Sequence, residues 1–276
     1  MTSHADTLPQ QALASPGAAT HPAFDKASAP PPVSQLVLTR VELRKLVDTR
    51  SGRWLLAVIG VSMIGMTCLI VFAGDKGDRT SADLFLASQM GLSILLPVVG
   101  ILSVTAEWSQ RTGSTTFALV PRRSRIVWAK VYATILLALA GIAVSAVVTV
   151  GGHALALATD RADGGWSIPV DLAATRILDS VLAVVSGIAF GMLLSNPLLA
   201  ILSSYAVPIV LGVLGETVSA LDTTMAWLSP GQALGPLSEE GTISAIEWAR
   251  IATTTALFTV APFVAGLWHT TRREIV

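Results

Sequence analysis

The sequence predicts an all-α integral membrane protein with six transmembrane helices, an amino-terminal interfacial helix and both termini in the cytoplasm. Three observations support this prediction. With 52% hydrophobic and 13% charged residues, the 276-residue chain has too few charges to cover a soluble globule of its size. Its apolar residues fall in long runs, and about 20 such residues cross a hydrocarbon core of roughly 30 Å. Lysine and arginine gather in alternate connections between those runs.

Six apolar runs within residues 35–276 are long enough to cross a membrane. The second and fifth contain Pro97 and Pro208, and a proline in the interior of a helix bends it. Ser195-Asn196-Pro197 forms a tight turn between the fourth and fifth runs, and proline suits a first helical turn. The expected spans are residues 54–73, 84–105, 126–157, 176–194, 197–218 and 247–268.

The charges and the tryptophans give independent information on topology. Twelve of the 18 lysines and arginines lie in the segment from Arg40 to Arg53, in the loop 106–130 and in the carboxyl-terminal tail. Twelve acids lie in the alternate connections and adjoining span ends, and all seven tryptophans lie at or beside span ends, where the indole ring prefers the interface. Both termini are therefore expected in the cytoplasm, which requires an even number of spans.

The segments before the first span differ in character. Residues 1–34 contain six of the 14 prolines and no apolar period, which indicates a disordered cytoplasmic tail, and they lack the pattern of a secretory signal. Residues 35–53 place Leu36, Leu43 and Val47 at helical spacing. Four charged residues accompany them: Arg40, Glu42, Arg44 and Lys45. This pattern favours a basic helix in the inner headgroup region, the alternative being a short helix that leads into the first span.

The expected exterior connections are acidic: a turn at residues 74–83, a loop at 160–179 and a Gly/Pro/Ser-rich segment at 220–244. Ionisable groups near span ends are Glu107, Asp179, Glu216 and His153. Glu107 is four residues before Arg111, and Asp179 is three after Arg176, so local helix pairs are expected. For His153 a polar contact is expected rather than a metal ligand.

No catalytic constellation stands out in the chain. There is no H-E-x-x-H sequence, no Ser/His pair at span depth and no G-x-x-x-x-G-K-[ST] phosphate loop. Leu228-Ser229-Pro230-Gly231-Gln232 is similar to the signature loop of ABC ATPases, but it lies in an expected exterior connection and cannot meet cytosolic ATP. We therefore expect no enzymatic activity and no cofactor in this chain, and no nucleic-acid partner.

The loop 106–130, here called the basic loop, is the expected working surface. It carries one acid, Glu107, against five basic residues: Arg111, Arg122, Arg123, Arg125 and Lys130. Residues 114–120 are long enough for about two helical turns, which Pro121 ends. A charged helix on so short a loop suits the transmission of force from a soluble partner. The alternative is a positive-inside anchor on anionic lipid.

Three segments together resemble the permease subunit of a type-2 ABC exporter. L-T-R-V-E-L-R-K-L at Leu38–Leu46 is similar to the amino-terminal interfacial helix of that family. The basic loop is similar to the family's loop between the second and third spans. The matching residues in order are Glu107, Arg111, Thr112, Gly113, Phe117, Pro121, Arg123, Arg125 and Lys130. Residues 220–244 occupy the place of short re-entrant helices between the fifth and sixth spans.

The resemblance implies a six-span permease in the plasma membrane that moves a lipophilic or drug-like substrate by ATP-driven alternating access. Its partners would be a second permease subunit, identical or not, membrane lipids and separate ABC ATPase subunits that carry ATP-Mg. The basic loop would form the coupling helix that docks on the ATPase. The first, second and fifth spans would form the subunit interface, and Gly60, Gly65 and Gly91 are candidates for close helix approach.

Two alternatives belong to other classes of function. A non-transporting membrane anchor or sensor would use the basic loop to bind lipid or a regulator. A secondary transporter would need an inverted repeat or a charge in the middle of a span, and the sequence supports neither.

Overall fold

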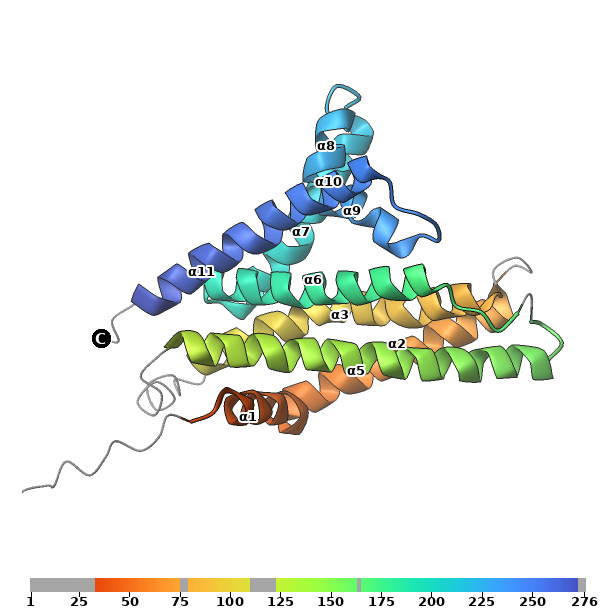
Figure 1. Cartoon of the computed structure of the whole chain (residues 1–276), viewed down its shortest axis with the longest axis horizontal. Coiled ribbons are helices and arrows are strands. Elements are labelled where there is room, and N and C mark those ends of the chain that lie inside the picture. Colours follow the sequence, from red (N-terminus) through yellow and green to blue (C-terminus); the bar gives the residue numbers. More distant parts are fainter. Residues whose placement is uncertain (1–32, 75–78, 110–122, 163–164, 273–276) are drawn as a thin grey trace, which may run out of the picture. The chain divides into compact units, whose positions relative to one another are not determined.

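The computed structural model describes residues 33–74, 79–109, 123–162 and 165–272, and these residues contain helices and no strand (Figure 1). The amino-terminal tail therefore lies outside the described residues. The helices before the middle of the chain are α1 (Gln35–Asp48), α2 (Arg50–Ala73), α3 (Ser81–Ser109) and α5 (Arg123–Ala158). Those after it are α6 (Val170–Leu194), α7 (Pro197–Thr217), α8 (Asp222–Leu228), α9 (Pro230–Ala233), the 3₁₀ helix η2 (Gly235–Ser238), α10 (Ala245–Thr255), the π-helical η3 (Ala256–Val260) and α11 (Ala261–Arg272).

Six helices among the described residues are long and apolar enough to cross a membrane: α2, α3, α5, α6, α7 and the continuous stretch from α10 through η3 to α11. The prediction of an all-helical chain with six such helices is confirmed. The turn of π-helix at η3, inside the last of them, was not predicted.

Local sequence explains where several helices begin. The Ser34 hydroxyl accepts a hydrogen bond from the Val37 amide at the start of α1, and the Thr49 hydroxyl does the same from Gly52 for α2. Pro197 lies in the first turn of α7, as the sequence predicts, and the Asn196 side chain caps this helix. A reciprocal capping box between Ser244 and Glu247 starts α10.

The packed centre lies between α2, α3, α5 and α6, which run side by side in Figure 1. Of an apolar 18-residue stretch of α3, 61% is buried inside the chain, against 11% of such a stretch of α7. Large apolar side chains on α2 and α7 are exposed instead, among them Val61, Leu198 and Ile209. So wide an apolar surface suits lipid or a protein partner rather than water.

Glycines let α3 and α6 approach closely. A Cβ atom built on Gly187 would lie 2.1 Å from the Pro97 carbonyl oxygen, and one on Gly100 would lie 2.3 Å from the Val184 carbonyl oxygen. Of the three glycines expected at close contacts, only Gly91 meets a neighbour, the Ser62 hydroxyl of α2. A Cβ on Gly60 or Gly65 meets nothing within 4 Å, so neither glycine packs closely on another described helix of the same chain, and their role at a subunit interface stays a prediction.

The prediction of a loop over residues 160–179 is wrong for its second half. The helix α6 begins at Val170, whereas the fourth span was expected to begin near Arg176. Pro169 occupies its N-cap position and Asp171 lies in its first turn, where a negative charge is favourable. Residues 222–238 form α8, α9 and η2, which pack back on α6, α7 and α10.

Candidate functional site

The structure describes part of the predicted coupling site. Arg125 and Lys130 are described with their side chains, whereas Glu107 and Arg123 are described only as helical positions. The remaining residues of the predicted site, namely Arg111, Thr112, Gly113, Phe117 and Pro121, lie outside the described residues, as does the helix expected at 114–120.

Lys130 lies at a junction of three helices. Its ammonium donates to Glu42 Oε2 of α1 at 2.7 Å and to the Ser103 carbonyl oxygen of α3 at 2.9 Å. Only 5% of the Lys130 side chain and 9% of the Glu42 side chain are exposed. Lys130, the last residue of the basic loop, is therefore a buried charged residue that links α5, α1 and α3.

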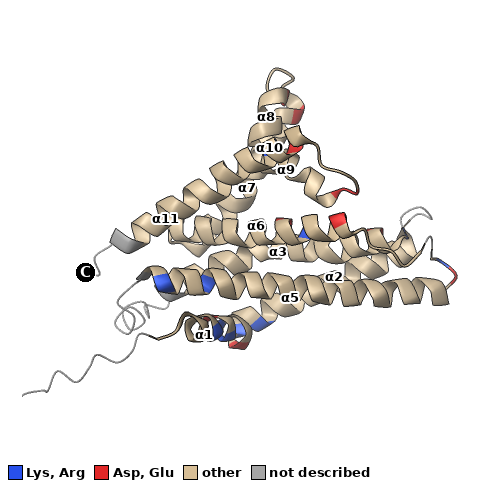
Figure 2. Ribbon diagram, viewed as in Figure 1, with Lys and Arg blue, Asp and Glu red and all other residues tan. Residues whose placement is uncertain are grey.

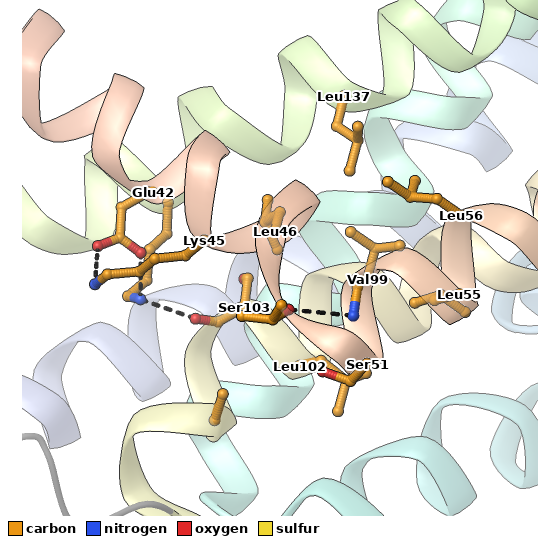
Figure 3. A pocket seen from close by; sticks show the side chains of 14 residues that line it. Glu42, Lys45, Leu46, Ser51, Leu55, Leu56, Val99, Leu102, Ser103 and Leu137 are labelled. Atoms are coloured by element: carbon orange, nitrogen blue, oxygen red, sulfur yellow. Dashed lines mark hydrogen bonds and ion pairs between the residues drawn. The ribbon is translucent and has the colours of Figure 1, made fainter.

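The Glu42 carboxylate receives a second cation, Lys45 of the same helix, at 2.6 Å from Oε1 (Figure 3). One buried carboxylate thus contacts two ammonium groups, one local and one 88 residues away in the chain. In surroundings of low dielectric such contacts are strong, and a partly satisfied charge is costly. We call the contacts of Glu42, Lys45, Lys130 and Ser103 the Glu42 junction.

Arg125 fixes the beginning of α1 to the beginning of α5. Its guanidinium donates to the Val33 carbonyl oxygen, and the Gln35 side-chain amide donates to the Arg125 carbonyl oxygen at 2.9 Å. With the Glu42 junction, these contacts hold α1 along the first turns of α5.

The other predicted residues of α1 point away from the bundle. Arg40 is exposed, and Arg44 makes an exposed ion pair with Asp48 at 2.9 Å. The face of α1 that packs on the bundle carries Thr39 and Glu42, whereas the outer face carries exposed apolar side chains: Leu36, Val37, Val41 and Val47.

A second buried cluster surrounds Arg176. Its guanidinium forms an ion pair with Asp179 at 3.1 Å, so the predicted local pair is confirmed. The same guanidinium also donates to the hydroxyls of Ser93 on α3 and Ser238 on η2. The sequence carries no signal for these two partners, because they are 83 and 62 residues away.

His153 makes the polar contact that the sequence predicts. The ring is 1% exposed, its Nδ1 lies 3.3 Å from Ser81 Oγ, and it packs edge-on against Trp166 at 4.3 Å between centroids. Glu216 is exposed at the end of α7. Within the described ranges, no three His, Cys, Asp or Glu side chains come together in a way that could hold a metal ion.

Charge is unevenly distributed along the bundle (Figure 2). Basic side chains gather where α1 lies beside the first turns of α2 and α5, whereas most acidic side chains lie on α6 and around α8, α9 and α10. Trp54, Trp128 and Trp268 are exposed on helices that begin or end at the basic end. Trp166, just before α6, and Trp248, on α10, are also exposed.

Comparison with protein-family models, with curated proteins and with solved structures finds no match for this chain. The fold and the site together define a helical protein with six span-length apolar helices and a buried ionic junction beneath its amino-terminal helix.

Proposed function

We propose that this chain is the membrane-spanning permease subunit of an ATP-driven exporter of the type-2 ABC class, powered by a separate ATPase subunit that docks on the basic loop. The observation that carries this proposal is the Glu42 junction. The described part of α3 ends at Ser109, six residues after Ser103, and α5 begins at Arg123, seven residues before Lys130. Lys130 contacts Ser103 and also Glu42 of α1, so the helix ends on either side of the basic loop are joined to each other and to α1.

This junction suits the transmission of force. A push on the basic loop from the cytoplasm would act on α3 and α5 at their joined ends, and the contacts of Glu42 and Arg125 would make α1 move with them. The two spans then act as levers, because they are continuous helices of 29 and 36 residues. Closure of two ATPase subunits would in this way reorient the spans of two paired permease subunits.

The outer face of α1 supports its assignment as an interfacial helix. Its exposed apolar residues alternate with exposed Arg40 and Arg44, which is the composition of a helix that lies among headgroups. The gathering of basic residues at the same end favours the cytoplasmic side of the plasma membrane for this end, and with it a cytoplasmic position of both termini.

Substitution in the basic loop is expected to uncouple the partners. Glu107→Ala and Arg125→Glu should leave membrane insertion intact and lower the ATPase activity of the permease–ATPase complex about tenfold, equivalent to about 1.4 kcal/mol. The measurement is ATP hydrolysis by the purified complex, compared with that of the ATPase subunit alone.

Arg53→Glu is the matched control, because Arg53 is exposed at the same basic end but lies outside the basic loop. If the ATPase subunit docks on the basic loop, the complex that contains Arg53→Glu should hydrolyse ATP at a near-normal rate. The alternative function, a non-transporting anchor or sensor, predicts instead that Arg125→Glu weakens binding of anionic lipid or of a regulator to the basic loop and that there is no ATPase activity to lose.

A further inference from the structure

A cavity of about 380 Å³ lies where α1 meets α2, α3 and α5. Figure 3 shows charged side chains at one end of it and leucines at the other. The charged end is formed by Glu42, Lys45 and Lys130, and Ser51 and Gly52 in the first turn of α2 also line the cavity. The cavity is therefore amphipathic.

A second cavity, of about 210 Å³, continues between α2, α3 and α5. Leu56, Val99 and Leu137 line both cavities, so the two adjoin. Every other residue that lines the second cavity is apolar or glycine. One of them, Val144, is 51% exposed, which opens this cavity at the outer surface of α5.

The two cavities match the two parts of an amphiphile. Taken together, the cavities of about 380 Å³ and 210 Å³ fall within the range of roughly 300–1,000 Å³ that small-molecule sites occupy. Burial of an acyl chain in the apolar cavity is favourable by about 25 cal/mol per Å². At the polar end, the ammonium groups of Lys45 and Lys130 outnumber the single Glu42 carboxylate, and this excess of positive charge favours a negatively charged headgroup.

We propose that these adjoining cavities bind one anionic membrane phospholipid, with an acyl chain in the apolar cavity and the phosphate beside Lys45. The lipid would lie directly against the Glu42 junction and fill the space beneath α1. This inference goes beyond the proposed function and stands whether or not an ATPase subunit binds the chain.

Two glycines of α2 allow a matched test of the chain site. A Cβ on either Gly60 or Gly65 meets no atom within 4 Å, but only Gly60 lines the apolar cavity. The full chain in detergent is titrated with phosphatidylglycerol and with phosphatidylcholine of identical acyl chains, and bound lipid is counted by native mass spectrometry. Gly60→Phe should weaken phosphatidylglycerol binding about tenfold, whereas Gly65→Phe should bind it like the wild type.

Lys45→Gln tests the headgroup site without filling either cavity. Because 44% of the Lys45 side chain is exposed and Glu42 keeps its contact with Lys130, the variant should fold normally. It should lose the preference for phosphatidylglycerol over phosphatidylcholine that the wild type is expected to show. Excess inorganic phosphate should not displace the lipid from the wild type.

Three results would overturn the proposal. Equal binding of phosphatidylglycerol by Gly60→Phe and Gly65→Phe would show that the bound lipid forms a non-specific layer around the protein. Absence of a headgroup preference in the wild type would remove the anionic site. Displacement by inorganic phosphate alone would show an anion site that holds no chain.

Discussion

Replacement of Glu42 by alanine is expected to lower the free energy of unfolding by about 3–5 kcal/mol, the cost of breaking a buried ion pair from one side. The variant removes the carboxylate that lies 2.7 Å from the Lys130 ammonium and 2.6 Å from that of Lys45. Of these two cations, Lys130 is the buried one, with 5% of its side chain exposed, so the variant removes the carboxylate from a buried ammonium. The measurement is unfolding of the detergent-purified chain by heat or denaturant.

Asp48→Ala provides the control on the same helix. It breaks the Arg44–Asp48 pair, whose side chains are 83% and 62% exposed, and such surface pairs contribute little. We therefore expect this variant to unfold like the wild type. Similar stability of Glu42→Ala and Asp48→Ala would mean that the junction does not hold α1 in place.

A double-mutant cycle separates the pair from its surroundings. Glu42→Gln and Lys130→Gln should each destabilise the chain, and together they should cost less than the sum of the two effects, by about 0.5–3 kcal/mol. Strict additivity would show that the two side chains act independently.

Introduction of a large side chain at Gly187 is the second substitution with a large expected effect. A Cβ at this position would lie 2.1 Å from the Pro97 carbonyl oxygen and 2.8 Å from the Pro97 carbonyl carbon, so Gly187→Leu meets backbone that no rotamer change can clear. We expect a loss of about 3 kcal/mol or more, because α3 and α6 would have to separate. The measurement is the yield of monodisperse protein and its melting temperature.

Gly151→Leu is the matched control for this steric prediction. Gly151 lies inside α5, and a Cβ there meets nothing within 4 Å. It should insert and melt like the wild type. If Gly187→Leu also does so, then α3 and α6 do not cross at these glycines.

Several features of the fold could be predicted because they depend on neighbouring residues. Apolar runs of span length, the turn that places Pro197 at the start of α7 and the Arg176–Asp179 pair each involve residues close together in the sequence. The start of α6 could not be placed, because Asp171 and Arg176 resemble loop residues until the buried partners of Arg176 are known.

Long-range partners explain most of what the sequence does not reveal. Glu42 and Lys130 were each expected at functional segments, one in the interfacial helix and one in the basic loop, but nothing in the sequence pairs two residues 88 positions apart. In the same way, Gly65 and Gly187 are both glycines in apolar runs. The difference arises from how the helices cross: a Cβ on Gly187 of α6 would meet the backbone of α3 at Pro97, whereas a Cβ on Gly65 of α2 would meet open space.

The most direct test of the proposed function is purification of the tagged full-length chain from the membranes of its native host in mild detergent. We predict that a nucleotide-binding ATPase subunit co-purifies with it and that the complex hydrolyses ATP. A monodisperse preparation that brings no such subunit and shows no ATP hydrolysis would contradict the assignment of this chain as an ATP-driven permease.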